Sequence, residues 1–407
     1  MKKPRMLFVS PEFPWPPRSG GCLRTFPILE FLAQHCELHC VTFAEREPEP
    51  EAARKLRSML AELTVLPLRP HRRTTLPRYV RNTVRMVRFV PPLVDRFAEP
   101  ASRRQLSALL KGNFDLVWLE HLWLAPYVAE IGPQATKILD AQNVESDLFR
   151  QLRKAYRHWP EQVGYYVFEK AARRIEQRYL PSFDQVLAVS PEDKQLLSRD
   201  CPPERIHVVP NAVQVPPLAL PETSSGKTLY FAGGLDYPPN RLAVLWFHQQ
   251  VWPMIRNRLP EAKWIIVGAC PELLNSGIHR DPQIVLAGRV ETTAPYLNSS
   301  AVAVVPITLG GGTRVKILDA WAAGKAVLST SAGAQGLEIR HGDNIWIADT
   351  PEEFGRGALQ LLSDSTLRAQ LGKRGWETVQ DHYSLPRLHE RLEAVLLQRL
   401  TGDGRCA

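Results

Sequence analysis

A glycine-rich segment between two apolar runs is the feature that most constrains the fold of this chain. Apolar runs of strand length lie at 301–305 and 326–329, and a glycine loop followed by a short helical pattern lies between them. Strand, helix and strand in this order predict a βαβ unit, which belongs to a parallel sheet. We expect Gly324 to end the helix in the left-handed conformation.

The same segment predicts a binding site for a diphosphate. Its candidate ligand-binding residues are Gly310, Gly311, Gly312, Thr313, Arg314, Lys316 and Asp319. Glycines allow a ligand close to the backbone, and the amides and dipole of a helix N-terminus favour an anion there. Asp319 lies one turn beyond Lys316 on the same helix face, where a carboxylate accepts hydrogen bonds from sugar hydroxyls. The alternative is a structural turn, because turns use glycine for steric reasons alone.

Strand-like runs alternate with amphipathic helices along both halves of the 407-residue chain. The runs lie at 6–10, 38–43, 116–119, 137–139, 185–189 and 206–209, and again at 228–232, 264–267, 284–286, 301–305, 326–328 and 345–347. This alternation predicts an α/β protein with two doubly wound, mostly parallel sheets. We expect a first domain over 1–212, a linker over 213–226, a second domain over 227–383, and a C-terminal helix and tail over 384–407.

Two helical regions have particular features. The pattern from Leu23 to His35 is helical, but Pro27 lies inside it, so we expect this helix to begin late or to kink there. The region from Glu352 to Leu400 is helical in pattern and has no clear strand.

The composition is that of a globular protein, with 44% apolar and 23% charged residues. Its six cysteines form no CxxC pair and have no metal-ligand spacing with histidine, which predicts a reduced, cytoplasmic setting. The chain also has no Asp-x-Asp pair to hold a metal, and we expect neither a metal nor a cofactor. No segment approaches the roughly 20 apolar residues that a membrane span needs.

The net charge of +9 has a local source. Ten arginines alternate with apolar residues: Arg69, Arg72, Arg73, Arg78, Arg81, Arg85, Arg88, Arg96, Arg103 and Arg104. This pattern predicts a basic, partly amphipathic surface for an anionic membrane face, an anionic acceptor or a nucleic acid. The alternative is a solvated helix pair with ordinary core contacts. We expect no nucleic-acid partner, because no repeated aromatic and basic platform accompanies the arginines.

In open α/β sheets, ligands bind at the carboxyl ends of the strands, so we expect the site in a cleft between the two domains. Gly20 and Gly21 follow the first strand and are candidates for the opposite wall, or form an ordinary strand-to-helix turn. His121 follows the strand at 116–119 and has either a catalytic or a structural role. Asn143 and Glu145 are further candidates, with helix capping as their alternative.

Motifs along most of the chain resemble those of the GT-B glycosyltransferases, specifically glycosyltransferase family 4. The most specific ones are Gly288, Arg289 and Val290, then Pro306, the glycine loop, 316–320, 323–327 and 333–337, with weaker ones at 140–145, 189–193 and 209–212. The resemblance implies two Rossmann-like domains, a nucleotide-sugar donor on the second, an acceptor on the first, and a final helix that crosses back. It also implies retention of anomeric configuration without a bound metal.

The resemblance assigns Asp319 to the donor ribose and His121 to the region of the reacting sugar. Three positions depart from the family pattern. Asp319 stands where Glu is usual, Gly311 stands where many members have a second Glu, and Gly234 stands where many have an Arg for the diphosphate. Arg314 and Lys316 are the first candidates to replace the missing charge, which stabilises the departing diphosphate, and Arg241 and Arg289 are further ones.

The sequence therefore predicts a glycosyltransferase of polysaccharide biosynthesis that transfers a sugar from a nucleoside diphosphate sugar to a glycan or lipid-linked acceptor. The basic region would dock it at the inner membrane face. Two alternatives remain open. One is a sugar-nucleotide epimerase or hydrolase of the same fold, and the other is a catalytically inactive sugar-nucleotide-binding protein.

Overall fold

The computed structural model describes residues 3–17, 19–68, 75–218, 226–268 and 276–400, with the backbone alone at 75–78 and 397–400. The chain forms two compact units. The first comprises the residues up to Pro210 together with those from His389 onward, and the second is Asn211–Leu388. Part of the expected linker, residues 219–225, lies outside the described residues, as do Cys270 and Cys406.

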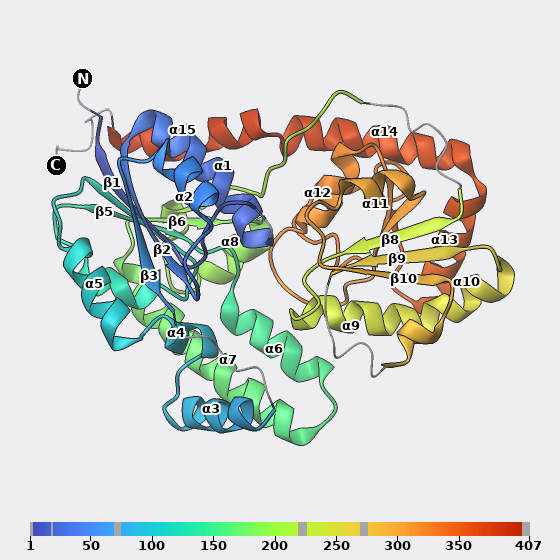
Figure 1. Cartoon of the computed structure of the whole chain (residues 1–407), viewed down its shortest axis with the longest axis horizontal. Coiled ribbons are helices and arrows are strands. Elements are labelled where there is room, and N and C mark those ends of the chain that lie inside the picture. The colour runs from blue at the N-terminus through green and yellow to red at the C-terminus, as the bar shows by residue number, and fades with distance from the viewer. Residues whose placement is uncertain (1–2, 18, 69–74, 219–225, 269–275, 401–407) are drawn as a thin grey trace. The chain divides into compact units, whose positions relative to one another are not determined.

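The first unit is built on a seven-stranded parallel sheet (Figure 1). Its strands are β1 (Arg5–Ser10), β2 (Glu37–Ala44), β3 (Glu62–Pro67), β4 (Leu116–Glu120), β5 (Thr136–Asp140), β6 (Gln185–Ala188) and β7 (Ile206–Val208), in the order β3-β2-β1-β4-β5-β6-β7. The order reverses between β1 and β4, as in doubly wound sheets. The predicted strands are confirmed, and β3 is an additional edge strand.

Helices surround this sheet, and several of them bury an apolar face in its core. They are α1 (Gly20–His35), α2 (Pro50–Arg57), α3 (Thr75–Val87), α4 (Pro92–Arg96), α5 (Pro100–Leu110), α6 (Glu145–Ala155), α7 (Trp159–Tyr179) and α8 (Pro191–Leu197). Val9, Val117 and Leu139, on three adjacent strands, are completely buried in one continuous core.

The second unit has a six-stranded parallel sheet of order β10-β9-β8-β11-β12-β13. Its strands are β8 (Thr228–Ala232), β9 (Lys263–Val267), β10 (Ile284–Gly288), β11 (Val302–Val305), β12 (Ala326–Ser329) and β13 (Trp346–Ile347). Its helices are α9 (Pro238–Trp246), α10 (Trp252–Arg258), α11 (Ala294–Ser299), α12 (Val315–Ala322), α13 (Pro351–Ser363) and α14 (Ser365–His382). The glycine segment thus lies in the predicted βαβ unit β11–α12–β12, and Gly324 has the expected positive φ of 64°.

The C-terminal region is helical, as the pattern predicts. α15 (Leu385–Leu400) follows α14, and from His389 onward it belongs to the first unit. There the ring of His389 packs against Phe31 of α1, with 5.0 Å between ring centroids.

The start of α1 differs from the sequence prediction. The helix begins at Gly20, not at Leu23, because the Ser19 side chain accepts a hydrogen bond from the Cys22 amide and caps it. It then continues past Pro27 to His35. Phe26, Ile28 and Leu29 flank the proline and are buried, so their burial offsets the backbone hydrogen bond that the proline cannot form.

Candidate functional site

The loop between β11 and α12 has a conformation that requires glycine at two positions. Gly310 has φ of 117° and Gly312 has φ of 74°, both in the region that side chains disfavour. The buried Arg314 side chain folds back over this loop and donates hydrogen bonds to the carbonyl oxygens of Gly311 and Leu309. A Cβ atom at Gly310 would lie 2.8 Å from Nη2 of Arg314. Arg314 therefore holds the loop, and its predicted contact with a diphosphate stays a prediction.

Lys316 connects α12 to the start of α9 and to β8. Its Nζ donates a hydrogen bond of 2.7 Å to Oδ1 of Asn240 and lies 4.3 Å from the centroid of the Phe231 ring. Asn240 in turn donates from Nδ2 to the carbonyl oxygen of Gly234, at 2.9 Å. Burial, together with the charge of Arg314, lowers the pKa of Lys316 to about 7.

The carboxyl group of Asp319 is half-buried without a partner. Within the part of the chain that the structure describes, it makes no hydrogen bond and no ion pair. Burial raises its pKa to about 7. Burial also raises the pKa of the neighbouring Tyr230 to about 12, and the charge of Asp319 adds to that shift. The Thr313 hydroxyl is another buried polar group without a partner among the described residues. Such groups indicate a place where a ligand completes the hydrogen bonding.

The neighbouring strand ends approach one another closely through glycines. A Cβ atom at Gly268 would lie 2.1 Å from the carbonyl oxygen of Gly233, and the Gly268 amide donates to the carbonyl oxygen of Gly288 at 2.8 Å. A Cβ atom at Gly233 would lie 2.9 Å from Nζ of Lys316. The structure therefore brings the glycine loop and Lys316 to the ends of β8 and β9, with Gly288 at the end of β10. After Gly288, the Arg289 side chain is exposed and Val290 packs against the core.

A second group of predicted residues lies at the carboxyl edge of the first sheet. Gly20 and Gly21 form the first turn of α1, and a Cβ atom at Gly21 would lie 3.8 Å from Nε2 of His121. His121 has φ of 62° and stacks on Trp123, with 4.0 Å between ring centroids. Burial lowers its pKa to about 3, so its imidazole is neutral. Glu12 lies beside Gly21 and accepts a 2.6 Å hydrogen bond from Ser19.

A buried polar network lies directly behind His121. Arg24 pairs with both oxygens of Asp140, at 2.7 and 2.8 Å, and donates to the carbonyl oxygen of Val209. The wholly buried Glu120 accepts hydrogen bonds from Thr25 at 2.7 Å and from Gln142 at 3.2 Å. Burial and the nearby Asp140 raise the pKa of Glu120 to about 8.

This network lies next to two unusual backbone conformations. Gln142 and His121 both have positive φ, of 54° and 62°, at the ends of adjacent strands. Strain of this kind in residues other than glycine is found most often at functional sites.

The first turn of α6 is not capped by Asn143. Asn143 donates instead to Glu145, at 3.4 Å. The Ser146 amide and hydroxyl both donate to Glu176 of α7, which supplies the cap. Burial raises the pKa of Glu145 to about 7.

Sequence reasoning missed Asn240, Glu12 and Gln142. Glu12 and Gln142 follow β1 and β5 within two residues, so the rule that ligands bind at carboxyl ends was enough to find them. Asn240 lies within the first turn of α9, and no local pattern distinguishes it from other helix residues.

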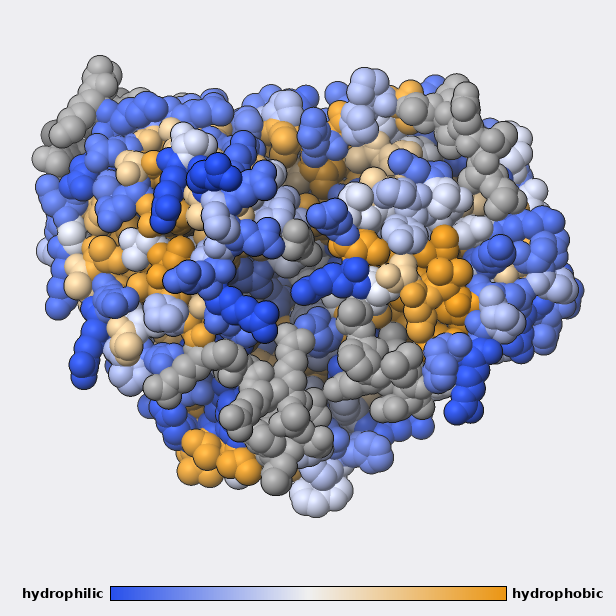
Figure 2. All heavy atoms as spheres, viewed as in Figure 1, coloured by the Kyte–Doolittle hydropathy of each residue, from blue (hydrophilic) through white to orange (hydrophobic). Residues whose placement is uncertain are grey.

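Several arginines of the expected basic surface are paired with acids, although only Arg85 of those with described side chains is buried. Arg85 and Arg88 pair with Asp95, Arg96 pairs with Glu45 and Arg103 with Glu130, while Arg104 is exposed. Arg69, Arg72, Arg73 and the side chain of Arg78 lie outside the described residues. Exposed apolar side chains gather on α3, as Figure 2 shows at the lower edge of the view. No helix in the described ranges has the length and apolar character to cross a membrane.

Comparison with known proteins adds family evidence for both units. Residues 226–364 match the family described as Glycosyl transferases group 1, and residues 42–212 match a Glycosyl transferase 4-like domain. An uncharacterized 44.6 kDa protein in the cps region of Klebsiella pneumoniae is 22% identical over 395 residues, or 93% of this chain and 96% of that protein. The lipopolysaccharide core biosynthesis glycosyltransferase LpsE of Rhizobium meliloti (strain 1021) is 32% identical over 164 residues, which cover 37% of this chain and about half, 48%, of that protein.

Solved structures share the fold at low identity. Sucrose-phosphate synthase from Thermosynechococcus elongatus aligns with a TM-score of 0.70 and 14% identity, over 98% of this chain and 100% of that one. Anabaena HepE in complex with UDP-glucose aligns with a TM-score of 0.66 and 12% identity, over 97% and 100%.

Proposed function

Because this chain belongs to the group 1 glycosyl transferases and has their GT-B fold, we propose that it transfers a sugar from a nucleoside diphosphate sugar to a glycan or lipid-linked acceptor. One observation carries the proposal. The glycine loop, the Lys316 ammonium and the unpartnered Asp319 carboxyl meet at the carboxyl ends of β8 and β11. The UDP-glucose complex of the HepE structure, which has the same fold, supports the donor class.

In this proposal the second unit binds the donor and stabilises the departing diphosphate. Negative charge accumulates on the diphosphate oxygens as the bond to the sugar breaks. The loop amides and Lys316 are fixed before the reaction, so they stabilise that charge without reorganising. Arg314 keeps the loop in place, and Asp319 accepts hydrogen bonds from the ribose hydroxyls.

The first unit would contribute the acceptor side. A neutral His121 beside Gly21 can hydrogen-bond a sugar hydroxyl through Nε2, and its stacking on Trp123 fixes the ring. We propose that transfer retains the anomeric configuration and proceeds without a metal or another cofactor. The experiment below also tests the two alternative functions. These are a sugar-nucleotide epimerase or hydrolase, and an inactive sugar-nucleotide-binding protein.

A donor screen tests this function. The release of free nucleoside diphosphate is followed for a panel of nucleotide sugars, with and without membrane extract, for the wild type, Lys316→Ala and Asp319→Ala. We expect release that needs the extract and that each substitution lowers by about 100-fold. Release without any acceptor indicates the epimerase or hydrolase, and donor binding without release indicates the inactive protein. If neither substitution lowers the rate of nucleoside diphosphate release, the proposed site is wrong.

We also propose that the first unit docks on an anionic membrane surface. Eight of the exposed large apolar residues lie on α3, on α7 or just after α3: Tyr79, Val80, Val84, Val87, Phe89, Trp159, Val163 and Tyr166. Val87 is 82% exposed and Trp159 is 74% exposed. An apolar helix face with nearby cations such as Arg88 and Lys170 fits the interface of an anionic bilayer.

Vesicle sedimentation tests this docking. We expect salt-sensitive binding to vesicles with anionic lipid, and Val87→Ser with Trp159→Ser to weaken it at least tenfold. Val285→Ser is the matched control, because Val285 is an exposed valine, at 43%, in the second unit. Equal binding to neutral and anionic vesicles, or equal loss in the control, contradicts membrane docking by this surface.

A further inference from the structure

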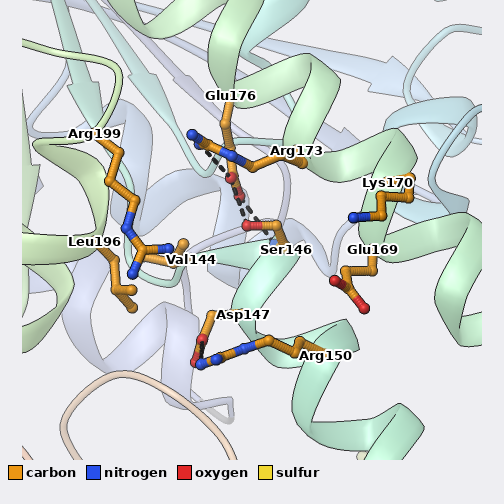
Figure 3. A pocket seen from close by; sticks show the side chains of 10 residues that line it. All are labelled: Val144, Ser146, Asp147, Arg150, Glu169, Lys170, Arg173, Glu176, Leu196 and Arg199. Carbon is orange, nitrogen blue, oxygen red and sulfur yellow. Dashed lines mark hydrogen bonds and ion pairs between the residues drawn. The ribbon is translucent and has the colours of Figure 1, made fainter.

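A cavity of about 210 Å³ lies in the first unit between the start of α6, the middle of α7 and the end of α8 (Figure 3). We call it the α7 pocket. Its polar wall includes Ser146, Asp147, Arg150, Lys170, Arg173 and Arg199. Ligand pockets for drug-sized molecules usually have about 300–1,000 Å³, so this cavity suits a small polar group rather than a sugar nucleotide.

The carboxylates of the α7 pocket already have partners. Both oxygens of Glu176 accept hydrogen bonds from Ser146, and Glu169 pairs with Arg153 at 3.0 Å. Asp147 pairs with Arg150. These acids are therefore neutralised or satisfied within the protein.

Two cations of the α7 pocket have no acidic partner in the described part of the chain. Arg173 is held by Asp200, with 2.8 Å between Nη2 and Oδ1. Arg199 and Lys170, in contrast, make no ion pair within the described part of the chain, and Lys170 lies 5.4 Å from the centroid of the Tyr166 ring. Figure 3 shows their side chains extending toward Ser146 from opposite sides of the cavity.

We propose that the α7 pocket binds a phosphate group between Arg199 and Lys170. A guanidinium offers a planar fork that binds two phosphate oxygens, and a lysine adds a flexible point charge from the other side. Because Glu176 already caps α6, the attraction comes from these side chains and not from helix-end amides. The phosphate would come either from the free ion or from the headgroup of a phosphorylated lipid.

Calorimetric titration of the full chain with inorganic phosphate tests the proposal without sugar transfer, so it is independent of the proposed function. We expect Arg199→Ala and Lys170→Ala each to weaken binding about fivefold, and the double variant to abolish it. Lys154→Ala is the matched control, because Lys154 is an exposed cation of α6 that does not line the pocket. It should bind phosphate as the wild type does.

A second titration uses glycerol 3-phosphate. Tighter binding of this ester than of inorganic phosphate points to a lipid headgroup, and equal binding points to the free ion. The proposal is overturned if the wild type binds neither ligand, or if Arg199→Ala and Lys170→Ala bind as Lys154→Ala does. It is also overturned if Lys316→Ala alone removes the binding, because the phosphate then occupies the glycine loop of the second unit.

Discussion

The polar groups at the carboxyl edge of the first sheet and those around the glycine loop of the second differ in how they are partnered. In the first unit, Arg24 and Asp140 form two short hydrogen bonds with each other, and Glu120 accepts from Thr25 and Gln142. In the second unit, Asp319 has no partner among the described residues. The Arg24–Asp140 pair is complete within the protein, although Oε2 of Glu120 has no partner among the described residues, whereas the Asp319 carboxyl has no partner at either oxygen there.

This difference separates two roles for buried polar residues. Removing one member of a complete network leaves its partner buried and unsatisfied, so the cost falls on stability. An incomplete cluster loses little stability on substitution, and the cost falls on binding. We therefore expect substitutions that break the Arg24–Asp140 pair to lower the free energy of unfolding, and those around the loop to lower donor turnover.

Arg24→Ala is expected to have the largest effect. It leaves the wholly buried Asp140 without a countercharge, which costs about 3–5 kcal/mol in free energy of unfolding. Denaturant titration measures this cost. The double variant Arg24→Ala with Asp140→Ala should be less destabilised than the sum of the single variants. Unchanged stability of Arg24→Ala would remove the distinction between the two regions.

Glu120→Gln is expected to change the pH dependence of stability. The unfolded carboxyl loses its proton near pH 4.5, whereas the folded one keeps it to about pH 8, so stability falls as pH rises between these values. The amide keeps the neutral form, which removes a loss of about 3 kcal/mol at pH 7. Unfolding curves of the wild type and the variant at pH 5 and pH 7.5 measure the difference. Parallel pH dependence in the two proteins contradicts a neutral Glu120.

Most of the fold could be predicted from periodicity. In the sequence, the strands of both sheets are short apolar runs, because both faces of a parallel sheet are buried. β3 was missed because it is an edge strand with only partial burial and its apolar run is interrupted by Thr64. The start of α1 was missed because the cap of Ser19 outweighs the presence of Pro27, which local propensity does not reveal.

The site could be predicted in part. The glycine loop, Lys316 and Asp319 are adjacent in sequence, so their spacing already indicated a common helix face. Asn240 lies 76 positions from Lys316, and only the fold brings them within 2.7 Å. The same holds for Arg24 and Asp140, 116 positions apart. Sequence did not reveal that Asp95, within the basic segment itself, pairs with Arg85, or that Glu45, from an earlier segment, pairs with Arg96.

Gly233→Ala tests the incomplete cluster directly. The new Cβ atom would lie 2.7 Å from Nδ2 of Asn240 and 2.9 Å from Nζ of Lys316, so both side chains must move. We expect kcat/KM for the donor to fall by about 10- to 100-fold, because a displaced cation stabilises the leaving group less. Gly234→Ala is the matched control, since its Cβ atom meets only Asp236, at 3.2 Å. Equal loss in both variants contradicts a role for the position of Lys316.

Asp319→Asn gives the smallest expected effect and the most specific one. In the free protein, Asp319 and Lys316 both titrate at about pH 7. Below pH 7 the protonated Asp319 is a weaker acceptor for ribose hydroxyls, and above pH 7 the neutral Lys316 attracts a diphosphate less. Affinity for the nucleoside diphosphate should therefore be highest near pH 7 and fall by up to about tenfold per pH unit on either side.

Calorimetric titration with that nucleoside diphosphate between pH 5.5 and 8.5 measures the decline in affinity below pH 7 and the decline above pH 7. Asp319→Asn should remove the acidic decline and keep the alkaline one. Lys316→Arg should do the reverse, because a guanidinium stays charged throughout this range. If both variants keep the wild-type profile, neither residue contacts the nucleotide, and the unpartnered Asp319 carboxyl is a feature of the fold and not of the binding site.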